Sequence, residues 1–321
     1  MISFPLRALA LIFSLSALAG AAQAADACRY VPVATLQLRG SGDIRQPTVD
    51  GTINGKPAVM LVDTGMRISM LVKDAADKYN VTLQQSGKYT YGIGGASVTY
   101  LARVDDFSVG AAHSGKAELG VLGNMGARPG FDAIMGANFL LQTDLEISLA
   151  EKQLKFFRAS DCGDTYLAYW NQDAMEIPFG GTETDFQINP RFIVEINGTR
   201  LEAIIDTGAT SSSITRAAAE RAGIRVDGPN VVRSGSSVGI GDARVANWVA
   251  EIDTFTLGSE TIKHTHIGIR DNAPQGHMGP DMLLGADFLR AHRVLIAMSQ
   301  RKLYVTYQGG EVFPQRRSSR N

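Results

Sequence analysis

The chain has 321 residues, of which 45% are hydrophobic and 20% are charged, and its formal net charge is −1. A balance this close to neutral excludes the strongly basic surface of nucleic-acid-binding and anionic-lipid-binding proteins, so no nucleic-acid partner is expected. Many glycines and an alternation of apolar and polar residues predict an all-β globular protein with a few short helices.

Residues 1–24 have the pattern of a secretory signal peptide. Arg7 precedes an apolar run at residues 8–20, and residues 22–24 have the Ala-x-Ala form of a cleavage site. The apolar run is shorter than the roughly twenty residues that a membrane-spanning helix needs. We therefore expect a periplasmic protein that begins near Ala25 and has no membrane span. An uncleaved anchor in the inner membrane is the alternative.

The tripeptide Asp-Thr-Gly occurs twice, each time behind an apolar strand and a turn. It begins at Asp63 and again at Asp206, 143 residues further on. In both copies an Asn-Gly pair, led by Asn54 or Asn197, precedes the strand and favours a type I′ hairpin turn. One copy arises by chance in roughly one chain of this length in twenty. Two copies in matched settings indicate an internal repeat.

The match between the two copies continues downstream in a constant order. Residues 70–80 and 214–223 are Ala-rich with charges, and each segment is predicted to form a short helix. Glycine-tipped hairpins follow, with tips at Gly92-Ile93-Gly94-Gly95 and at Gly239-Ile240-Gly241. Residues 132–140 then match 281–289, and closing strands end each unit.

This order predicts a first lobe at residues 25–160, a linker at 161–174 and a second lobe at 175–321. Cys28 lies at the start of the first lobe, and Cys162, the other cysteine, lies in the linker. Two cysteines in an exported chain indicate a disulfide that ties the amino terminus to the linker. Two unrelated buried thiols are the alternative.

Two apolar residues before Asp-Thr-Gly, a glycine-rich hairpin and a later apolar-apolar-Gly before a helix are the signature of aspartic proteases. The chain resembles the retropepsin-like, retroviral-type family in a bacterial exported form with both halves fused. The resemblance implies two similar acid-protease lobes, a cleft between them and one aspartate from each. It also implies a protein or peptide substrate and a monomer that acts as a pseudo-dimer. Two glycine tips favour this pattern over the pepsin type, which usually has one flap.

Asp63 and Asp206 are the candidate catalytic residues, because two carboxyl groups that share one proton supply an acid beside a base. Ordinary turn aspartates are the alternative. The resemblance implies that Thr64 and Thr207 cross-bond beneath the dyad. It implies that Gly65 and Gly208 let the backbone approach the carboxylates, and Thr210 follows the family pattern. Substrate would contact the glycine tips, namely Gly92, Ile93, Gly94, Gly95, Gly239, Ile240 and Gly241.

Met66 and Arg67 depart from the family pattern in the first copy. Pepsin-like dyads often have a Ser or Thr after the glycine, and neither Met66 nor Ala209 carries that hydroxyl. We therefore expect a dyad less acid-shifted than in pepsins. Arg67 would stabilise the Asp63 anion if it points inward. If it points outward, it would contact substrate and favour an acidic side chain there.

No cofactor or metal is expected. The glycine tips lack the P-loop lysine and the spacing of a dinucleotide site. His264 and His266 lie on one face of a predicted strand, but no third metal ligand is evident. The favoured function is a periplasmic aspartic endopeptidase that acts on extended protein segments, either as a processing protease for a membrane or periplasmic protein or as a degradative one. The main alternative is a non-catalytic peptide-binding adaptor that retains the fold.

Overall fold

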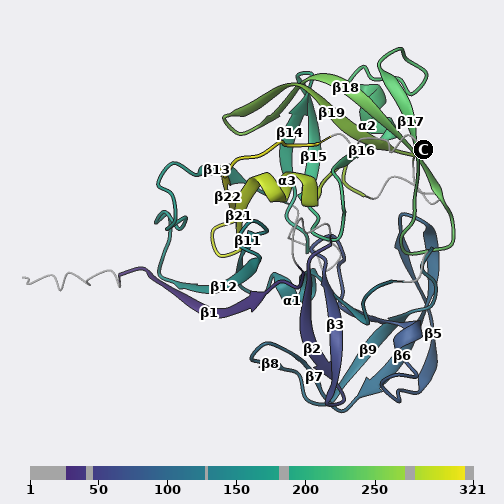
Figure 1. Ribbon diagram of the computed structural model, residues 1–321. Coiled ribbons are helices and arrows are strands. Elements are labelled where there is room, and N and C mark those ends of the chain that lie inside the picture. Colours follow the sequence, from purple (N-terminus) through teal and green to yellow (C-terminus); the bar gives the residue numbers. More distant parts are fainter. Residues whose placement is uncertain (1–26, 41–45, 127–128, 181–187, 272–278, 315–321) are drawn as a thin grey trace, which may run out of the picture.

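The computed structural model describes residues 27–40, 46–126, 129–180, 188–271 and 279–314. The predicted signal peptide lies outside these residues. The described residues form three β-sheets: one in each lobe and a third to which both lobes contribute strands (Figure 1). The all-β prediction is confirmed, since the helices are few and short.

The first lobe is a nine-stranded sheet in the order β5-β6-β9-β4-β10-β3-β2-β7-β8. Its elements are β2 (Thr48–Ile53), β3 (Lys56–Val62), β4 (Met70–Val72), the 3-10 helix η1 (Lys73–Ala75), β5 (Leu83–Gly92), β6 (Gly95–Val104), β7 (Phe107–Val109), β8 (Ala112–His113), β9 (Ala117–Leu122), β10 (Ala133–Met135) and α1 (Ala137–Leu140).

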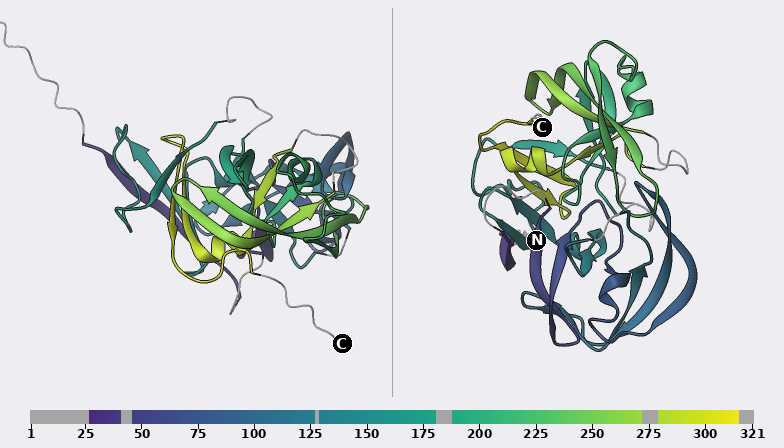
Figure 2. Two further views of the ribbon diagram at one scale, coloured as in Figure 1. Left: turned by 90° about the horizontal axis from the view of Figure 1, so that it is seen from above. Right: turned by 45° about the vertical axis from the view of Figure 1, so that its right-hand side comes forward.

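The second lobe is a seven-stranded sheet in the order β14-β15-β20-β16-β19-β18-β17. Its elements are β14 (Phe192–Ile196), β15 (Thr199–Ile205), β16 (Ser213–Thr215), α2 (Arg216–Arg221), β17 (Val231–Ser237), β18 (Val245–Leu257), β19 (Glu260–Arg270), β20 (Met282–Leu284) and α3 (Ala286–Ala291). In both lobes the long hairpins, β5–β6 and β17–β18, extend toward each other (Figure 2).

The third sheet joins the lobes and has six strands, in the order β1-β12-β11-β21-β22-β13. Its strands are β1 (Arg29–Gln37), β11 (Asp144–Ser148), β12 (Gln153–Ser160), β13 (Met175–Pro178), β21 (His292–Ala297) and β22 (Lys302–Tyr307). At its centre β11 of the first lobe pairs antiparallel with β21 of the second, so that Leu145 lies opposite Ile296. Both side chains are buried, and the sheet therefore continues the core from one lobe into the other.

Both Asn-Gly turns have the conformation that the sequence predicts. Asn54 and Gly55 have φ of 50° and 71°, and Asn197 and Gly198 have φ of 50° and 77°. Positive φ at both central residues defines the type I′ turn, which matches the right-handed twist of its strands. The turns thus fix the register of the hairpins that end at Asp63 and Asp206.

The predicted helix at residues 70–80 was wrong at its start. Met70–Val72 is strand β4, and only the single 3-10 turn of Lys73–Ala75 follows. In the second lobe α2 does form, and Thr215 caps it by accepting a hydrogen bond from Ala218 N at 3.1 Å. The equivalent residue in the first lobe is Val72, which has no side-chain oxygen to cap a helix.

The predicted disulfide between Cys28 and Cys162 is present. It ties the segment before β1 to the chain that leaves β12, with 134 residues between the two cysteines. Next to it the ring of Tyr30 stacks on Phe157 at 4.7 Å. The amino-terminal strand is thereby held at the edge of the six-stranded sheet.

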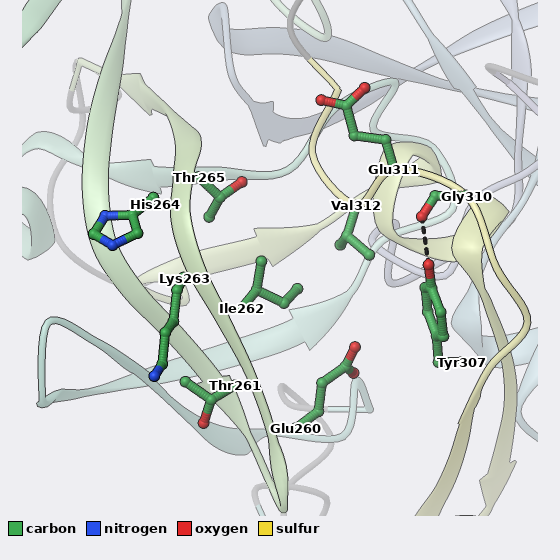
Figure 3. A pocket seen from close by; sticks show the side chains of 10 residues that line it. All are labelled: Glu260, Thr261, Ile262, Lys263, His264, Thr265, Tyr307, Gly310, Glu311 and Val312. Atoms are coloured by element: carbon green, nitrogen blue, oxygen red, sulfur yellow. Dashed lines mark hydrogen bonds between the residues drawn. The ribbon is translucent and has the colours of Figure 1, made fainter.

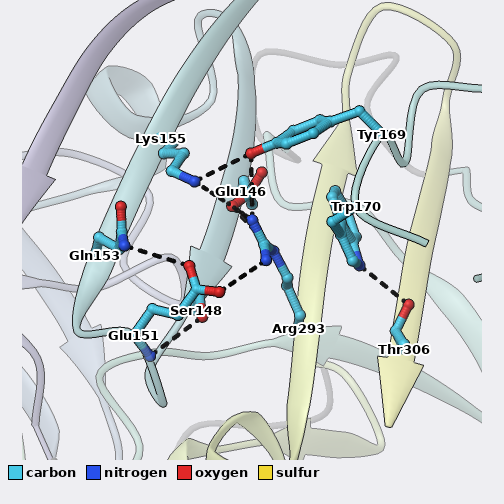
Figure 4. Close-up of polar contacts among 9 residues, drawn as sticks. All are labelled: Glu146, Ser148, Glu151, Gln153, Lys155, Tyr169, Trp170, Arg293 and Thr306. Atoms are coloured by element: carbon cyan, nitrogen blue, oxygen red, sulfur yellow. Dashed lines mark hydrogen bonds and ion pairs between the residues drawn. The ribbon is translucent and has the colours of Figure 1, made fainter. Parts of the chain in front are cut away.

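Arg293 of β21 joins the two lobes to the linker through a buried network (Figure 4). Its guanidinium donates to Glu146 of β11 at 2.7 and 3.1 Å and to Glu151 at 2.9 Å. It also lies over the rings of Tyr169 and Trp170, 4.7 Å from the centroid of Trp170. Two lobes and the linker therefore share one cation, with the aromatic rings excluding water from it.

None of the helices in the described residues is long and apolar enough to cross a membrane.

Candidate active site

The two aspartates end equivalent strands of the two lobes. Asp63 follows β3, and its backbone N–H donates to Met135 of the parallel strand β10 at 3.0 Å. Asp206 follows β15, and its N–H donates to Leu284 of β20 at 2.9 Å. Each carboxyl group is thus placed where the chain leaves the sheet, while hydrogen bonds to the sheet hold its backbone.

Thr64 and Thr207 fasten the two turns to each other. Thr64 N donates to Thr207 Oγ1 at 3.0 Å, and Thr207 N donates to Thr64 Oγ1 at 3.1 Å. Each hydroxyl then donates to a backbone carbonyl of the other lobe, Ile205 at 2.8 Å and Val62 at 2.7 Å. Because both threonines are fully buried, these bonds fix the separation of the carboxyl groups above them.

Gly65 and Gly208 lie directly against the carboxyl groups. A Cβ at Gly65 would overlap the carboxyl of Asp206, and a Cβ at Gly208 would overlap that of Asp63. Each turn therefore approaches the aspartate of the other lobe as closely as only glycine permits.

The carboxyl groups of Asp63 and Asp206 accept hydrogen bonds from backbone N–H groups. Asp63 Oδ1 accepts from Met66 N at 2.9 Å, and Asp206 Oδ1 accepts from Gly208 N and Ala209 N, both at 3.0 Å. Met66 and Ala209 stand where the sequence comparison placed a Ser or Thr hydroxyl, and each donates to its aspartate through its backbone N–H. Gly65 N is a second backbone donor to Asp63, so each carboxyl has two such donors.

The two carboxyl groups differ in proton affinity. Burial raises the pKa of Asp63 to about 8, and the negative charge of Asp206 adds to this shift, while the N–H groups of Met66 and Gly65 oppose it. Burial also raises the pKa of Asp206, but the N–H groups of Ala209 and Gly208 and the positive charge of Arg270 lower it. A side-chain hydrogen bond between the carboxyls raises the pKa of Asp63 and lowers that of Asp206. These effects favour protonation of Asp63 over protonation of Asp206.

A second layer of polar contacts holds each turn against the helix that follows the apolar-apolar-Gly motif. Ser212 donates from N and Oγ to Asp287 of α3 at 2.7 and 2.6 Å, and its Oγ accepts from Gly285 N at 2.9 Å. In the first lobe Ser69 makes the same contacts with Asn138 of α1, at 2.8 and 2.9 Å. The helices thus support the aspartate turns from behind.

The glycine tips form flaps that contact each other. The first flap is the hairpin β5–β6 with tip Gly92–Gly95, and the second is β17–β18 with tip Gly239–Gly241. Gly94 N donates to Ile240 O at 2.8 Å, and Gly94 O accepts from Ala243 N at 3.0 Å. Gly241 has φ of +95°, and a Cβ there would overlap Gly94. Glycine at both positions permits this backbone contact.

Arg67 and Thr210 occupy equivalent, partly buried positions four residues after their aspartates. The carbonyl of Arg67 accepts from Asn138 N at 3.0 Å, which ties it to α1. Ile93 lies near the opposite flap, since a Cβ at Gly239 would be 3.5 Å from Ile93 Cβ. All the predicted site residues thus belong to the two turns or the two tips.

Two residues near the dyad were missed from the sequence. Asn189 donates from its side-chain amide to the carbonyl of Thr64, across the lobe boundary. Arg270 ends β19 and acts on Asp206. The aligned tripeptides Gly-Val-Leu at 120–122 and Gly-Ile-Arg at 268–270 carried the signal for Arg270, because an arginine replaces a leucine there.

The predicted pairing of His264 and His266 on one strand face is interrupted. His264 has φ of 50°, outside the extended range that gives regular alternation. It lines a surface cavity of ≈ 380 Å³ with Glu260 and Tyr307, remote in the chain from both aspartates (Figure 3). Within the described residues, no group of three or more His, Cys, Asp or Glu side chains is arranged to hold a metal ion.

Comparisons with known proteins agree with this geometry. A family model described as aspartyl protease matches residues 49–139 and 192–288, one segment in each lobe. Among solved structures, an aspartic proteinase from Irpex lacteus matches with a TM-score of 0.51 over 88% of this chain and 97% of its own, at 15% sequence identity. The comparison with curated proteins gave no significant match. The chain is therefore a member of the aspartyl protease family and has the two-lobed fold of the pepsin-like proteinases.

Proposed function

We propose that the protein is a periplasmic aspartic endopeptidase that hydrolyses peptide bonds in extended protein segments. The observation that carries the proposal is the reciprocal bonding of Thr64 and Thr207, which fastens together the two turns that carry Asp63 and Asp206. A pure binding module gains nothing from two like-charged groups held together at this cost.

The dyad supplies both functions that hydrolysis needs. In the singly protonated state, the anionic carboxylate accepts a proton from a water molecule between the two groups as the water oxygen attacks the scissile carbonyl. The protonated carboxyl donates its proton to the carbonyl oxygen, giving a neutral tetrahedral diol. The carboxyl that took the proton of the water then donates it to the amide nitrogen. The other carboxylate takes a proton from a diol hydroxyl as the C–N bond breaks, so the dyad returns to its singly protonated state.

The flaps support an extended substrate. Each flap has a glycine tip, and the N–H and C=O groups of Gly94 in the first tip bond to Ile240 and Ala243 of the second flap. The same groups can bond to a peptide backbone that lies between the tips and the dyad, as a strand adds to a sheet edge. Selection by main-chain contacts favours unfolded or exposed segments, so a processing role on a membrane or periplasmic protein fits this site.

Export is supported by the pattern of residues 1–24 and by the Cys28–Cys162 disulfide, since disulfides persist in oxidising compartments. Fractionation of cells that express the full chain tests this. We expect a disulfide-bonded protein in the periplasm, and a reduced protein in the cytoplasm would contradict the localisation.

Cleavage of a mixed peptide library tests the activity. The disulfide-bonded protein that begins at Ala25 is incubated with the library between about pH 4 and about pH 9, beside Asp63→Asn and Asp206→Asn. The matched control is Asp227→Asn, which changes an exposed aspartate. We expect cleavage by wild type and control only. Cleavage that survives both dyad substitutions would overturn the mechanism, and none by wild type at any pH would favour the adaptor function.

A further inference from the structure

The internal repeat gives each lobe a parallel strand pair beside its aspartate turn, and the two pairs differ at one charged position. In the first lobe β4 pairs with β9, so that Val72 lies opposite Leu122. In the second lobe β16 pairs with β19, so that Thr215 lies opposite Arg270. Leu122 and Arg270 are therefore equivalent positions of the repeat, one apolar and one cationic.

The two side chains have opposite environments. Leu122 is 1% exposed and belongs to the hydrophobic core. The guanidinium of Arg270 is fixed by backbone and hydroxyl oxygens: Nη1 donates to Ser213 O at 3.1 Å and to Ser213 Oγ at 3.2 Å, and Nη2 donates to Pro280 O at 3.2 Å. These acceptors are neutral, so they hold the cation in place without cancelling its charge.

The other charged residues near Arg270 do not offset the charge difference between the two lobes. Arg270 interacts electrostatically with Asp206 and with Asp281. Asp281 already pairs with Arg221 at 2.5 Å. The first lobe has the same pair, Lys78 with Asp132 at 2.8 Å.

Beyond β19 the next charged residue is Asp271, which lies 3.9 Å from Arg216. That aspartate also has a cationic neighbour. Arg270 is thus a charge beside Asp206 that has no counterpart beside Asp63. Two other equivalent positions also differ in charge, namely Thr210 against Arg67 and Asp287 against Asn138.

We propose that Arg270 is the positioning residue of the dyad, whose fixed positive charge keeps Asp206 as the anion and leaves the shared proton on Asp63. The inference rests on the proposed function and assigns its two roles. Asp206 accepts the proton of the attacking water, and Asp63 donates to the scissile carbonyl. Burial lowers the pKa of Arg270 only to about 10, so the guanidinium stays charged throughout the range in which the dyad is singly protonated.

With these roles, each limb of the pH profile reports the ionisation of one aspartate. The acid limb of kcat/KM reports ionisation of Asp206, and the alkaline limb reports ionisation of Asp63. Removal of the cation raises the pKa of Asp206, so only the acid limb moves, toward higher pH. A shift of about one pH unit is the size expected for the loss of one nearby charge in a partly buried site.

Four variants separate charge from structure. Arg270→Leu installs the residue of the first lobe, and Arg270→Gln removes the charge but keeps a donor for the carbonyl oxygens. Arg270→Lys keeps the charge, and Arg225→Leu removes an exposed arginine as the control. We expect both neutral variants to shift the acid limb upward, while Arg270→Lys and the control keep the wild-type midpoint. An unmoved acid limb in a folded neutral variant overturns the proposal, as does an equal shift in Arg270→Lys.

A second measurement requires neither catalysis nor a folded neutral variant. In protein with ¹³C-labelled aspartate carboxyls, the dyad signals are those lost in Asp63→Asn and in Asp206→Asn. We expect the Asp206 signal of wild type to ionise first, and the reverse order overturns the proposal. Absence of cleavage by wild type would refute the proposed function and leave this titration intact. Cleavage with the reverse order would refute the role of Arg270 alone.

Discussion

Thr64 and Thr207 each donate a backbone N–H to the hydroxyl of the other, at 3.0 and 3.1 Å, although 143 residues separate them. Each hydroxyl also donates back into the opposite lobe. The aspartate turns therefore move as one unit, and neither lobe can shift without breaking buried hydrogen bonds.

Thr207→Val removes the hydroxyl but keeps the shape of the side chain. It leaves Thr64 N and the carbonyl of Val62 without their partner, which should lower the free energy of unfolding by about 2 to 4 kcal/mol. Urea denaturation measures this loss. The rate of peptide cleavage should also fall, by at least about 10-fold, because the dyad loses its fixed separation. Thr207→Ser keeps the hydroxyl and is the control. Equal stability of the Val and Ser variants would contradict the role of these bonds.

Asp63 should make the protein less stable as the pH rises. Its pKa is 3.8 when unperturbed and about 8 in the folded protein, so the folded state binds this proton more tightly than the unfolded state. The stabilisation is complete below the unfolded pKa and is lost as the pH rises through the folded pKa. Asp63→Asn removes this dependence. Thermal unfolding across the pH range should show that wild type loses more stability than the variant as the pH rises. Parallel plots of melting temperature against pH would exclude the raised pKa.

The same shift sets the working range of the enzyme. Because Asp63 keeps its proton until about pH 8, the singly protonated dyad extends to neutral pH. Peptide cleavage should therefore be highest at mildly acidic to neutral pH and should decline above about pH 8. A sharp optimum below about pH 3 would contradict both the raised pKa of Asp63 and the argument from Met66 and Ala209.

Gly94→Ala should weaken the contact between the flaps. A Cβ at this position would lie 2.9 Å from the carbonyl oxygens of Ile240, Gly241 and Ala243, closer than side chains normally approach. The tips must separate, so we expect KM for peptides to change while the unfolding free energy stays within about 1 kcal/mol of wild type. Gly130→Ala is the control, because a Cβ there meets nothing within 4 Å. If both variants have wild-type KM, the contact between the tips does not affect substrate entry.

Arg293→Met should loosen the junction of the lobes. It leaves Glu146 buried with Lys155 as its cationic neighbour among the described residues, at 3.6 Å, and should cost about 3 to 5 kcal/mol in unfolding free energy. The double variant with Glu146→Leu should recover part of this loss, since the buried charge is then gone. Chemical denaturation of both variants measures the difference. A double variant less stable than Arg293→Met would show that the ion pair is not the source of the loss.

Local signals allowed much of the site to be predicted from the sequence. Asn54 and Asn197 begin type I′ turns because their φ preferences act within a few residues, and the strands behind the aspartates follow from them. Residues 70–80 were misassigned because their composition favours a helix, whereas Met70 and Leu71 are fully enclosed between β9 and β10. Arg270 was missed because its relation to Asp206 depends on the parallel pairing of β16 and β19, which no local pattern specifies.

The pairing of β11 with β21 at the centre of the six-stranded sheet has a consequence for how the chain folds. A first lobe made alone would end in an unpaired strand edge with apolar residues on it, a surface prone to association with other chains. That edge is covered only when β21 has been synthesised, near the end of the chain. Biogenesis therefore has a vulnerable interval, in which the nascent first half requires protection until its counterpart emerges.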